Sequence, residues 1–198
     1  VHLSSAQSLD VIRSARDRGL PITVETCPHY LTFAAEEIPD GATEYKCAPP
    51  IREASEREAL WQALIEGDID MIASDHSPCP PSMKNSDGDF FGCWGGIASL
   101  QLSLSAVWTG AHDRGHTMAD VTRWMCRSTA QLARLGDRKG MVAEGCDADI
   151  AFLDPDATFV VQAEALHHRH HVTPYAGRTL RGIVRNTFVG GEPVVSIH

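Results

Sequence analysis

Three side chains of types that bind metal ions follow apolar runs of the sequence. His2, His29 and Asp75 come at or just after the ends of VHL, ITVETC and IAS. Two neutral imidazoles and a carboxylate suit a divalent ion such as zinc. Such an ion lowers the pKa of bound water, and a nearby carboxylate can take the released proton. Each residue also has an ordinary alternative, a solvated histidine or an aspartate that caps a turn, so spacing alone leaves both interpretations open.

Other polar and glycine-rich stretches are candidate contacts for a substrate. His76 either touches a ligand or belongs to a turn. Cys47 has no neighbouring base that would make it a nucleophile, so we interpret it as lining a pocket. Residues 92–96, GCWGG, lack the phosphate-loop pattern and either let backbone groups approach a ligand or form a flexible loop. The histidines within 167–171 surround an arginine, which favours a solvated loop over a metal site.

Alternating strands and helices are expected to position these residues. Periodicity and capping residues predict strands at 1–3, 22–27, 43–47 and 69–74, and helices at 4–18, 34–37, 55–66, 97–108 and 118–135. This order predicts an α/β fold with parallel strands, and its four strand–helix units suit half of a (β/α)8 barrel. The carboxyl ends of such strands share one edge, where barrel sites are built. Beyond residue 136, short β-like pieces predict a small separate sheet.

Composition limits the functional classes. The chain has 198 residues, a net charge of −9 and no evident basic face, which argues against binding nucleic acid or an anionic membrane surface. No apolar run approaches the roughly 18–20 residues that cross a bilayer, and no signal peptide is visible. None of the six cysteines forms a C-x-x-C pair. We therefore expect reduced, mostly buried cysteines in a cytoplasmic protein.

Several motifs resemble the cyclic amidohydrolases, the family of allantoinase, dihydroorotase, hydantoinase and dihydropyrimidinase. In chain order they are ETCPHYL, KCAPPIR, IASDHSPC and WGGIASLQ, followed by KGMVAEGCDADIAFLD and TPYAGRTLRGIVRNTFVGGEPV. The resemblance covers essentially the whole chain. SDHSPCPP together with WGGIASLQ resembles the allantoinase branch more than the others.

The resemblance implies a fold and a chemistry. Residues 1–136 would carry strands 5–8 of a (β/α)8 barrel, and residues 137–198 would form part of a small β-sandwich. Two divalent metal ions, zinc first among them, would be held in the intact protein, with His2, His29 and Asp75 as ligands from this chain. A metal-bridging hydroxide would open the ring of allantoin to allantoate, with Asp75 as general base and then acid.

The resemblance also implies substrate contacts and partners. The contacts would be Cys47, Ala48, Pro49, His76, Trp94, Gly95 and Gly96. The family's H-x-H pair on strand 1 and its bridging lysine on strand 4 have no counterpart here, so we expect the C-terminal half of the enzyme, inactive by itself. The intact protein would act on a small cyclic ureide as a homotetramer. Hydantoinase, dihydropyrimidinase or dihydroorotase specificity, or a non-catalytic relative, stays open.

Overall fold

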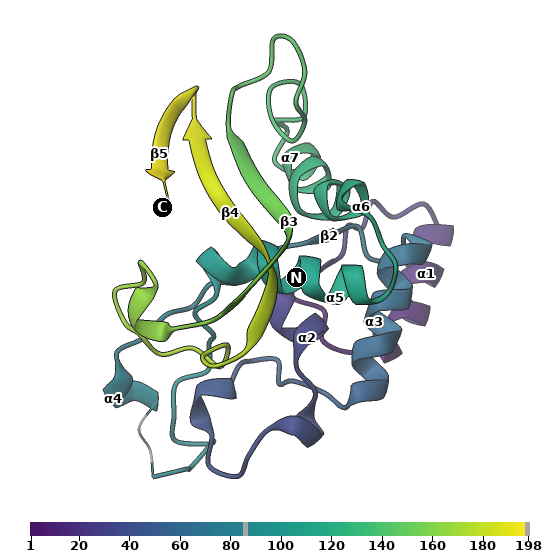
Figure 1. Cartoon of the computed structure of the whole chain (residues 1–198). Helices are drawn as coiled ribbons and strands as arrows, with labels where there is room; N and C mark the ends of the chain where they lie inside the picture. Colours follow the sequence, from purple (N-terminus) through teal and green to yellow (C-terminus); the bar gives the residue numbers. More distant parts are fainter. Residues whose placement is uncertain (85–86, 197–198) are drawn as a thin grey trace. The chain divides into compact units, whose positions relative to one another are not determined.

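The chain folds into two compact units, each built from helices and a small sheet (Figure 1). The computed structural model describes residues 1–84 and 87–196. The first unit comprises Val1–Ser103 and Val161–Arg178, and the second comprises Leu104–Val160 and the chain from Thr179 onward. An α/β fold is thus confirmed, and every candidate site residue belongs to the first unit.

The first unit contains a parallel strand pair surrounded by helices and 3₁₀ turns (η). In chain order its elements are η1 (Ala6–Ser8), α1 (Leu9–Asp17), β1 (Glu25–Thr26), α2 (Pro28–Thr32), η2 (Ala35–Glu37), η3 (Thr43–Tyr45), α3 (Ala54–Glu66), β2 (Met71–Ile72), α4 (Pro81–Lys84), η4 (Leu100–Leu102) and η6 (Ala163–Ala165). Strands β1 and β2 pair in parallel, with Glu25 opposite Met71. The strands predicted at 22–27 and 69–74 are therefore present, but each has only two residues in regular pairing.

The first residues of the chain lie beside β1, although they form no regular strand. The N–H of Leu3 donates to the Glu25 carbonyl (2.8 Å), and the Thr26 hydroxyl donates to the Leu3 carbonyl (2.7 Å). On the other edge of β1, the N–H of Ala73 donates to the Thr26 carbonyl (3.0 Å). Three chain segments thus run side by side and end at one edge, where the candidate ligands follow.

Helices α1 and α3 form where helical spacing and capping residues predict them. The Ser5 side chain accepts a hydrogen bond from the N–H of Gln7 and caps η1, the 3₁₀ turn that leads into α1, whereas Ser8 before α1 makes no side-chain capping bond. Gly67 ends α3 with φ of 84°, a left-handed conformation that glycine adopts without steric cost. The buried face of α3 carries Leu60, Trp61, Ala63 and Leu64. Burial of each large apolar side chain contributes about 1.5–3 kcal/mol.

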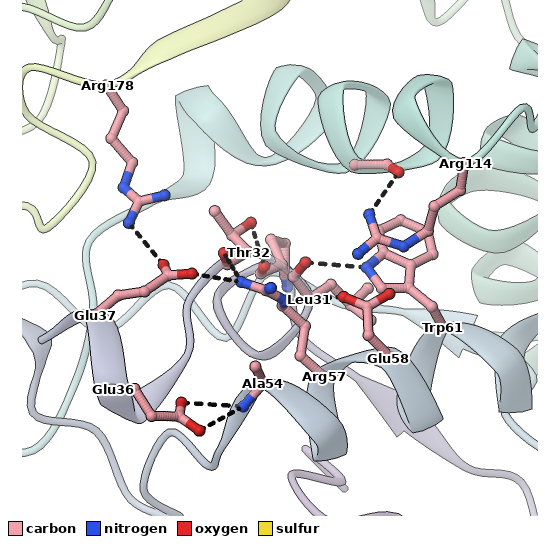
Figure 2. A network of polar contacts seen from close by, with 12 residues as sticks. Leu31, Thr32, Glu36, Glu37, Ala54, Arg57, Glu58, Trp61, Arg114 and Arg178 are labelled. Atoms are coloured by element: carbon pink, nitrogen blue, oxygen red, sulfur yellow. Dashed lines mark hydrogen bonds and ion pairs between the residues drawn. The ribbon is translucent and has the colours of Figure 1, made fainter.

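Charged side chains fasten the segment 161–178 to the first unit (Figure 2). The Glu37 carboxylate accepts hydrogen bonds from Arg57 (3.0 Å) and from Arg178 (3.3 Å), which lies 141 positions later in the chain. Burial by itself raises the pKa of Glu37, but the two arginines outweigh it and hold the pKa below its ordinary value. The Arg178 guanidinium also lies 4.6 Å from the centroid of the Phe33 ring.

The strand predicted at 43–47 is wrong. This segment forms the 3₁₀ turn η3, in which the N–H of Lys46 donates to the Thr43 carbonyl (3.0 Å). Because its donors bond to carbonyls three residues earlier, the segment does not present them to a neighbouring strand.

The helix predicted at 97–108 begins later than expected, at η4, and continues as α5 (Ser103–Asp113). Ile97 instead forms an isolated parallel bridge with His76. The N–H groups of Ser99 and Leu100 donate to the His76 ring at 3.0 and 3.1 Å. These bonds to a distant side chain hold residues 97–99 out of the helix and place its start at Leu100.

The second unit packs α5 against a three-stranded antiparallel sheet. Its other elements are α6 (Met118–Thr122), a π-helical turn (Arg123–Arg127), α7 (Ser128–Leu132), β3 (Ile150–Val160), β4 (Thr179–Val189) and β5 (Glu192–Ser196). The hydroxyl of Ser105 donates to the Gly182 carbonyl (2.6 Å), and the Trp108 indole donates to the Pro155 carbonyl (2.9 Å). The helix predicted at 118–135 thus exists in three pieces, and the small sheet is present. No helix in the described residues combines the length and apolarity needed to cross a bilayer.

Substitution of Gly140 provides a test of how tightly the second unit is packed. Its φ is 85°, and a Cβ there would lie 2.7 Å from the Cys126 carbonyl oxygen and 2.8 Å from the Ala130 Cβ. We expect Gly140→Ala to lower the free energy of unfolding by about 2–4 kcal/mol, because left-handed strain and overpacking add. Gly145 has the same φ with nothing within 4 Å of the added Cβ, so Gly145→Ala should cost only about 1–2 kcal/mol. Chemical denaturation measures both, and equal losses would contradict the packing argument.

Candidate functional site

Three potential metal ligands converge where β1 and β2 end. The Cys27 Sγ, an imidazole nitrogen of His29 and a carboxylate oxygen of Asp75 all lie within 4.8 Å of one another, the one such group of three or more donors in the described residues. Cys27 is the last extended residue before α2, and Pro28 occupies the first turn of that helix, as proline favours. His29 therefore lies in the first turn, directly after the strand.

Asp75 adopts an unusual backbone conformation beside these residues. Its φ is 43°, in the left-handed region, which a residue other than glycine adopts at an energetic cost. Aspartate and asparagine tolerate this region better than most residues. The Asp75 side chain is exposed, whereas Cys27 and His29 are fully buried. The group is thus enclosed by protein at Cys27 and His29 and open to solvent at Asp75.

His29 is suited to hold a cation. Both of its ring nitrogens are buried and lack a hydrogen-bond partner. Burial, followed by the nearby His2, lowers the pKa of His29 to about 3, so its imidazole is neutral at physiological pH. An unsatisfied buried polar group costs about 1–3 kcal/mol, which coordination of an ion would offset. The donor set therefore fits a divalent metal ion.

His2 lies near His29 but outside the group of three donors. Its Nδ1 is buried without a hydrogen-bond partner, and its φ of 42° is left-handed. The N–H of His2 donates to the Glu25 carboxylate (3.2 Å). The structure thus brings His29 and Asp75 into one group and leaves His2 at its margin.

Tyr30 links this group to the predicted substrate segment at Cys47–Pro49. The rings of His29 and Tyr30 are 4.2 Å apart, and the Tyr30 hydroxyl donates to the Pro49 carbonyl (2.7 Å). The peptide bond between Ala48 and Pro49 is cis. Burial raises the pKa of the Cys47 thiol to about 11, so the thiol stays protonated at neutral pH, unlike that of a reactive cysteine.

The glycine-rich loop lies directly against this segment. The N–H of Gly96 donates to the Lys46 carbonyl (3.0 Å), and a Cβ on Gly95 would lie 3.6 Å from the Ala48 Cβ. A Cβ on Gly96 would lie 2.5 Å from the Ser77 hydroxyl oxygen. Glycine at 96 is therefore required by the close approach of two protein segments, and the two predicted substrate segments are neighbours.

Two lysines hold the glycine-rich loop and the segment beside it through hydrogen bonds to backbone carbonyls, which the sequence pattern does not reveal. The Lys46 ammonium donates to the Cys93 carbonyl (2.7 Å), and the buried Lys84 ammonium donates to the Lys46 carbonyl (2.8 Å). Burial lowers the pKa of Lys84. The loop holds Trp94 with 42% of its surface exposed, so its indole is available to a ligand.

His76 is held in one tautomer by the start of η4. Its Nδ1 accepts the N–H groups of Ser99 and Leu100, so the ring proton of the neutral form resides on Nε2. The ring of His168 lies 4.9 Å from that of His76, and both His168 nitrogens are buried without a partner. The interpretation of 167–171 as a solvated loop is therefore wrong for His168.

Comparisons with known proteins identify the family of this chain. The sequence matches the amidohydrolase family over residues 1–194. The chain belongs to the amidohydrolase family. It is 53% identical to the allantoinase of Streptomyces avermitilis, in an alignment that covers 99% of this chain and 43% of that protein. It is 50% identical to the allantoinase of Arabidopsis thaliana, in an alignment that covers 98% of this chain and 39% of that protein. Its structure is similar to that of an L-hydantoinase (dihydropyrimidinase) from Arthrobacter aurescens, with a TM-score of 0.90 and 29% sequence identity. The match covers 98% of this chain and 44% of the hydantoinase chain.

This amidohydrolase chain spans less than half the length of these relatives. Within it, Cys27 is the donor that the sequence pattern did not single out, since a lone buried cysteine is ordinarily a packing residue. The spacing Cys-x-His directly after a β-branched run is the feature that points to it, because it places both side chains at one strand end.

Proposed function

We propose that this chain supplies part of the active site of an allantoinase, which hydrolyses allantoin to allantoate. The observation that carries the proposal is that His29, whose ring nitrogens are buried without a hydrogen-bond partner, lies close to Asp75. The chain that holds these two residues is about half identical to allantoinases along its length. Hydantoinase and dihydropyrimidinase are the alternatives, supported by structural neighbours that share only 27–30% of the sequence. Identity to the allantoinases is much higher, which favours allantoin.

The proposed roles follow from the burial and chemistry of each side chain. His2, His29 and Asp75 hold divalent ions, two in the intact protein, with zinc the first choice. Such ions polarise an amide carbonyl and lower the pKa of water. Asp75, on the open side, takes a proton from the attacking water and delivers it to the ring nitrogen that leaves. His29 stays neutral and donates a lone pair throughout.

The proposed substrate contacts would offer a ring polar backbone groups and one aromatic face. A cyclic ureide presents N–H and C=O groups around a small ring. Complementary acceptors and donors would come from the backbone of Cys47–Pro49, the backbone of Trp94–Gly96 and the Nε2–H of His76. The exposed Trp94 indole would cover the ring.

We also infer the larger architecture. Residues 1–136 would be half of a (β/α)8 barrel, carrying strands 5–8, and residues 137–198 a segment of a β-sandwich. The antiparallel sheet β3–β4–β5 and the similarity to hydantoinases support this division. The intact protein would be a cytoplasmic homotetramer.

Turnover of a substrate panel by the full-length protein tests the function. We expect kcat/KM for allantoin to exceed that for hydantoin, dihydrouracil and dihydroorotate by about 10–200-fold. A chelator should abolish activity, and zinc should restore it. The 198-residue chain tested alone should be inactive. Faster hydrolysis of another ring, or activity that resists the chelator, would contradict the proposal.

A further inference from the structure

One carbonyl oxygen joins the two backbone segments that are proposed to contact the substrate. The Lys46 carbonyl accepts the N–H of Gly96 (3.0 Å) and also the ammonium of Lys84 (2.8 Å). Lys46 directly precedes Cys47–Pro49, and Gly96 is the last residue of the second segment. Because a carbonyl oxygen has two lone pairs, it can serve both donors. The position of this oxygen therefore fixes how the two segments lie against each other.

Lys84 reaches this oxygen from the end of α4, where its side chain is buried with 6% of its surface exposed. Burial of an ammonium ion costs free energy, and an uncharged side chain of similar length would fill the same space at a lower cost. The specific contribution of a lysine here is the hydrogen bond that it donates. Such a bond is stronger than one between neutral groups, and burial protects it from screening by salt.

Backbone contacts at the end of α4 hold Lys84 against the same part of the molecule. The Lys84 carbonyl accepts the hydroxyl of Thr43, a buried residue of η3. The Met83 carbonyl accepts the N–H of Trp94 (2.8 Å). The end of α4 is thus fixed both to the turn before the first segment and to the start of the second.

The bond to the Lys46 carbonyl also fixes the direction of a backbone donor. The C=O of Lys46 and the N–H of Cys47 belong to one planar peptide group, and in a trans peptide they point in opposite directions. A cation that holds the carbonyl therefore holds the Cys47 N–H, which is one of the backbone donors proposed to contact a ring.

We propose that Lys84 is a positioning residue for the substrate: through the Lys46 carbonyl, its ammonium sets the placement of Cys47–Pro49 against Trp94–Gly96 and thereby the affinity for a cyclic ureide. The inference rests on the proposed function and deepens it, since it assigns a role in that site to a residue that does not contact the ring. The candidate metal ligands follow other chain segments, so loss of the ammonium weakens binding more than it slows the chemical step.

Steady-state kinetics of the full-length protein test this role. Lys84→Met keeps the length of the side chain and removes the donor, so KM for allantoin should rise by about 10–100-fold while kcat changes by less than about threefold. Lys84→Arg keeps a cationic donor and should recover most of the affinity. A purely space-filling role predicts the reverse order, because methionine matches the volume of lysine better than arginine does. Lys139→Met removes a lysine of the second unit and should leave both constants unchanged.

Hydrogen exchange provides a second measurement that does not depend on turnover. In the full-length Lys84→Met protein, deuterium uptake should rise in residues 43–49 and 91–96 and stay unchanged in α1. If this variant does not fold, Lys84→Gln replaces it; its weaker, neutral hydrogen bond should raise KM by about 3–10-fold.

The outcomes separate this inference from the proposed function. Unchanged exchange in both segments, or a KM within about twofold of wild type, would overturn the role of Lys84 even if the protein hydrolyses allantoin rapidly. A protein that prefers another ring, and whose KM for that ring rises in Lys84→Met, would contradict the proposed function and support the role of Lys84.

Discussion

Replacing Asp75 with asparagine is expected to lower kcat for allantoin hydrolysis by about 10²–10⁴-fold in the full-length protein. Asparagine removes the carboxylate that would accept the proton from water. It keeps an oxygen donor, and like aspartate it tolerates the left-handed φ of 43° at this position. The variant thus separates loss of the base from loss of the local backbone structure.

Metal content and a second aspartate serve as controls for this experiment. Metal analysis of the Asp75→Asn protein should show that ions are retained, which assigns the loss of rate to proton transfer. Asp10 has a side chain that is 91% exposed and lies on α1, so Asp10→Asn should leave kcat unchanged. A kcat for Asp75→Asn within a factor of two or so of wild type would exclude Asp75 as the general base.

Truncation of Trp61 is expected to have the largest effect on stability. Its side chain is 1% exposed, and its indole N–H donates to the Leu31 carbonyl at 3.0 Å (Figure 2). Trp61→Ala should lower the free energy of unfolding by about 3–5 kcal/mol, through lost apolar burial and the cavity that remains. The bond also ties α3 to the helix that carries His29, so metal binding should weaken as α3 loosens.

Two further tryptophan variants separate the contributions of volume and of the hydrogen bond to this loss of stability. Trp61→Phe keeps most of the volume and leaves the Leu31 carbonyl without its donor, so we expect a loss of about 1–3 kcal/mol. Trp94 is 42% exposed on a loop, and Trp94→Ala should change stability by about 0.5 kcal/mol or less. Denaturant titration gives all three values. If Trp61→Ala cost no more than Trp94→Ala, the packing of α3 would have to be reconsidered.

Local pattern was enough to locate helices α1 and α3 and the general edge of the site. Helices α1 and α3 follow from apolar spacing and from glycines just after their ends, and Ser5 caps the 3₁₀ turn that leads into α1, because these features act within one or two turns. His29 and Asp75 follow from the rule that parallel strands end at a common edge. The structure brings both into one group of donors.

Features that depend on distant partners did not follow from local pattern. The strand predicted at 43–47 is a 3₁₀ turn stabilised by its own carbonyls, and the helix predicted from 97 is delayed because its first N–H groups bond to His76. The polar composition of 167–171 predicts a solvated loop, yet the return of segment 161–178 places His168 beside His76. The second and third differences come from contacts between residues that are far apart in the sequence, and the first comes from hydrogen bonds within the turn itself.

The sequence by itself therefore determined the family, the helical segments and two of the candidate ligands, since motif identity and hydrophobic period are local properties. Only the tertiary structure decided that Cys27 faces His29 and Asp75 and that His2 stands at the margin. Side-chain direction at a strand end depends on the φ and ψ angles of single residues and on what packs behind them. Those angles are set when the whole unit folds, and no repeating pattern along the chain encodes them.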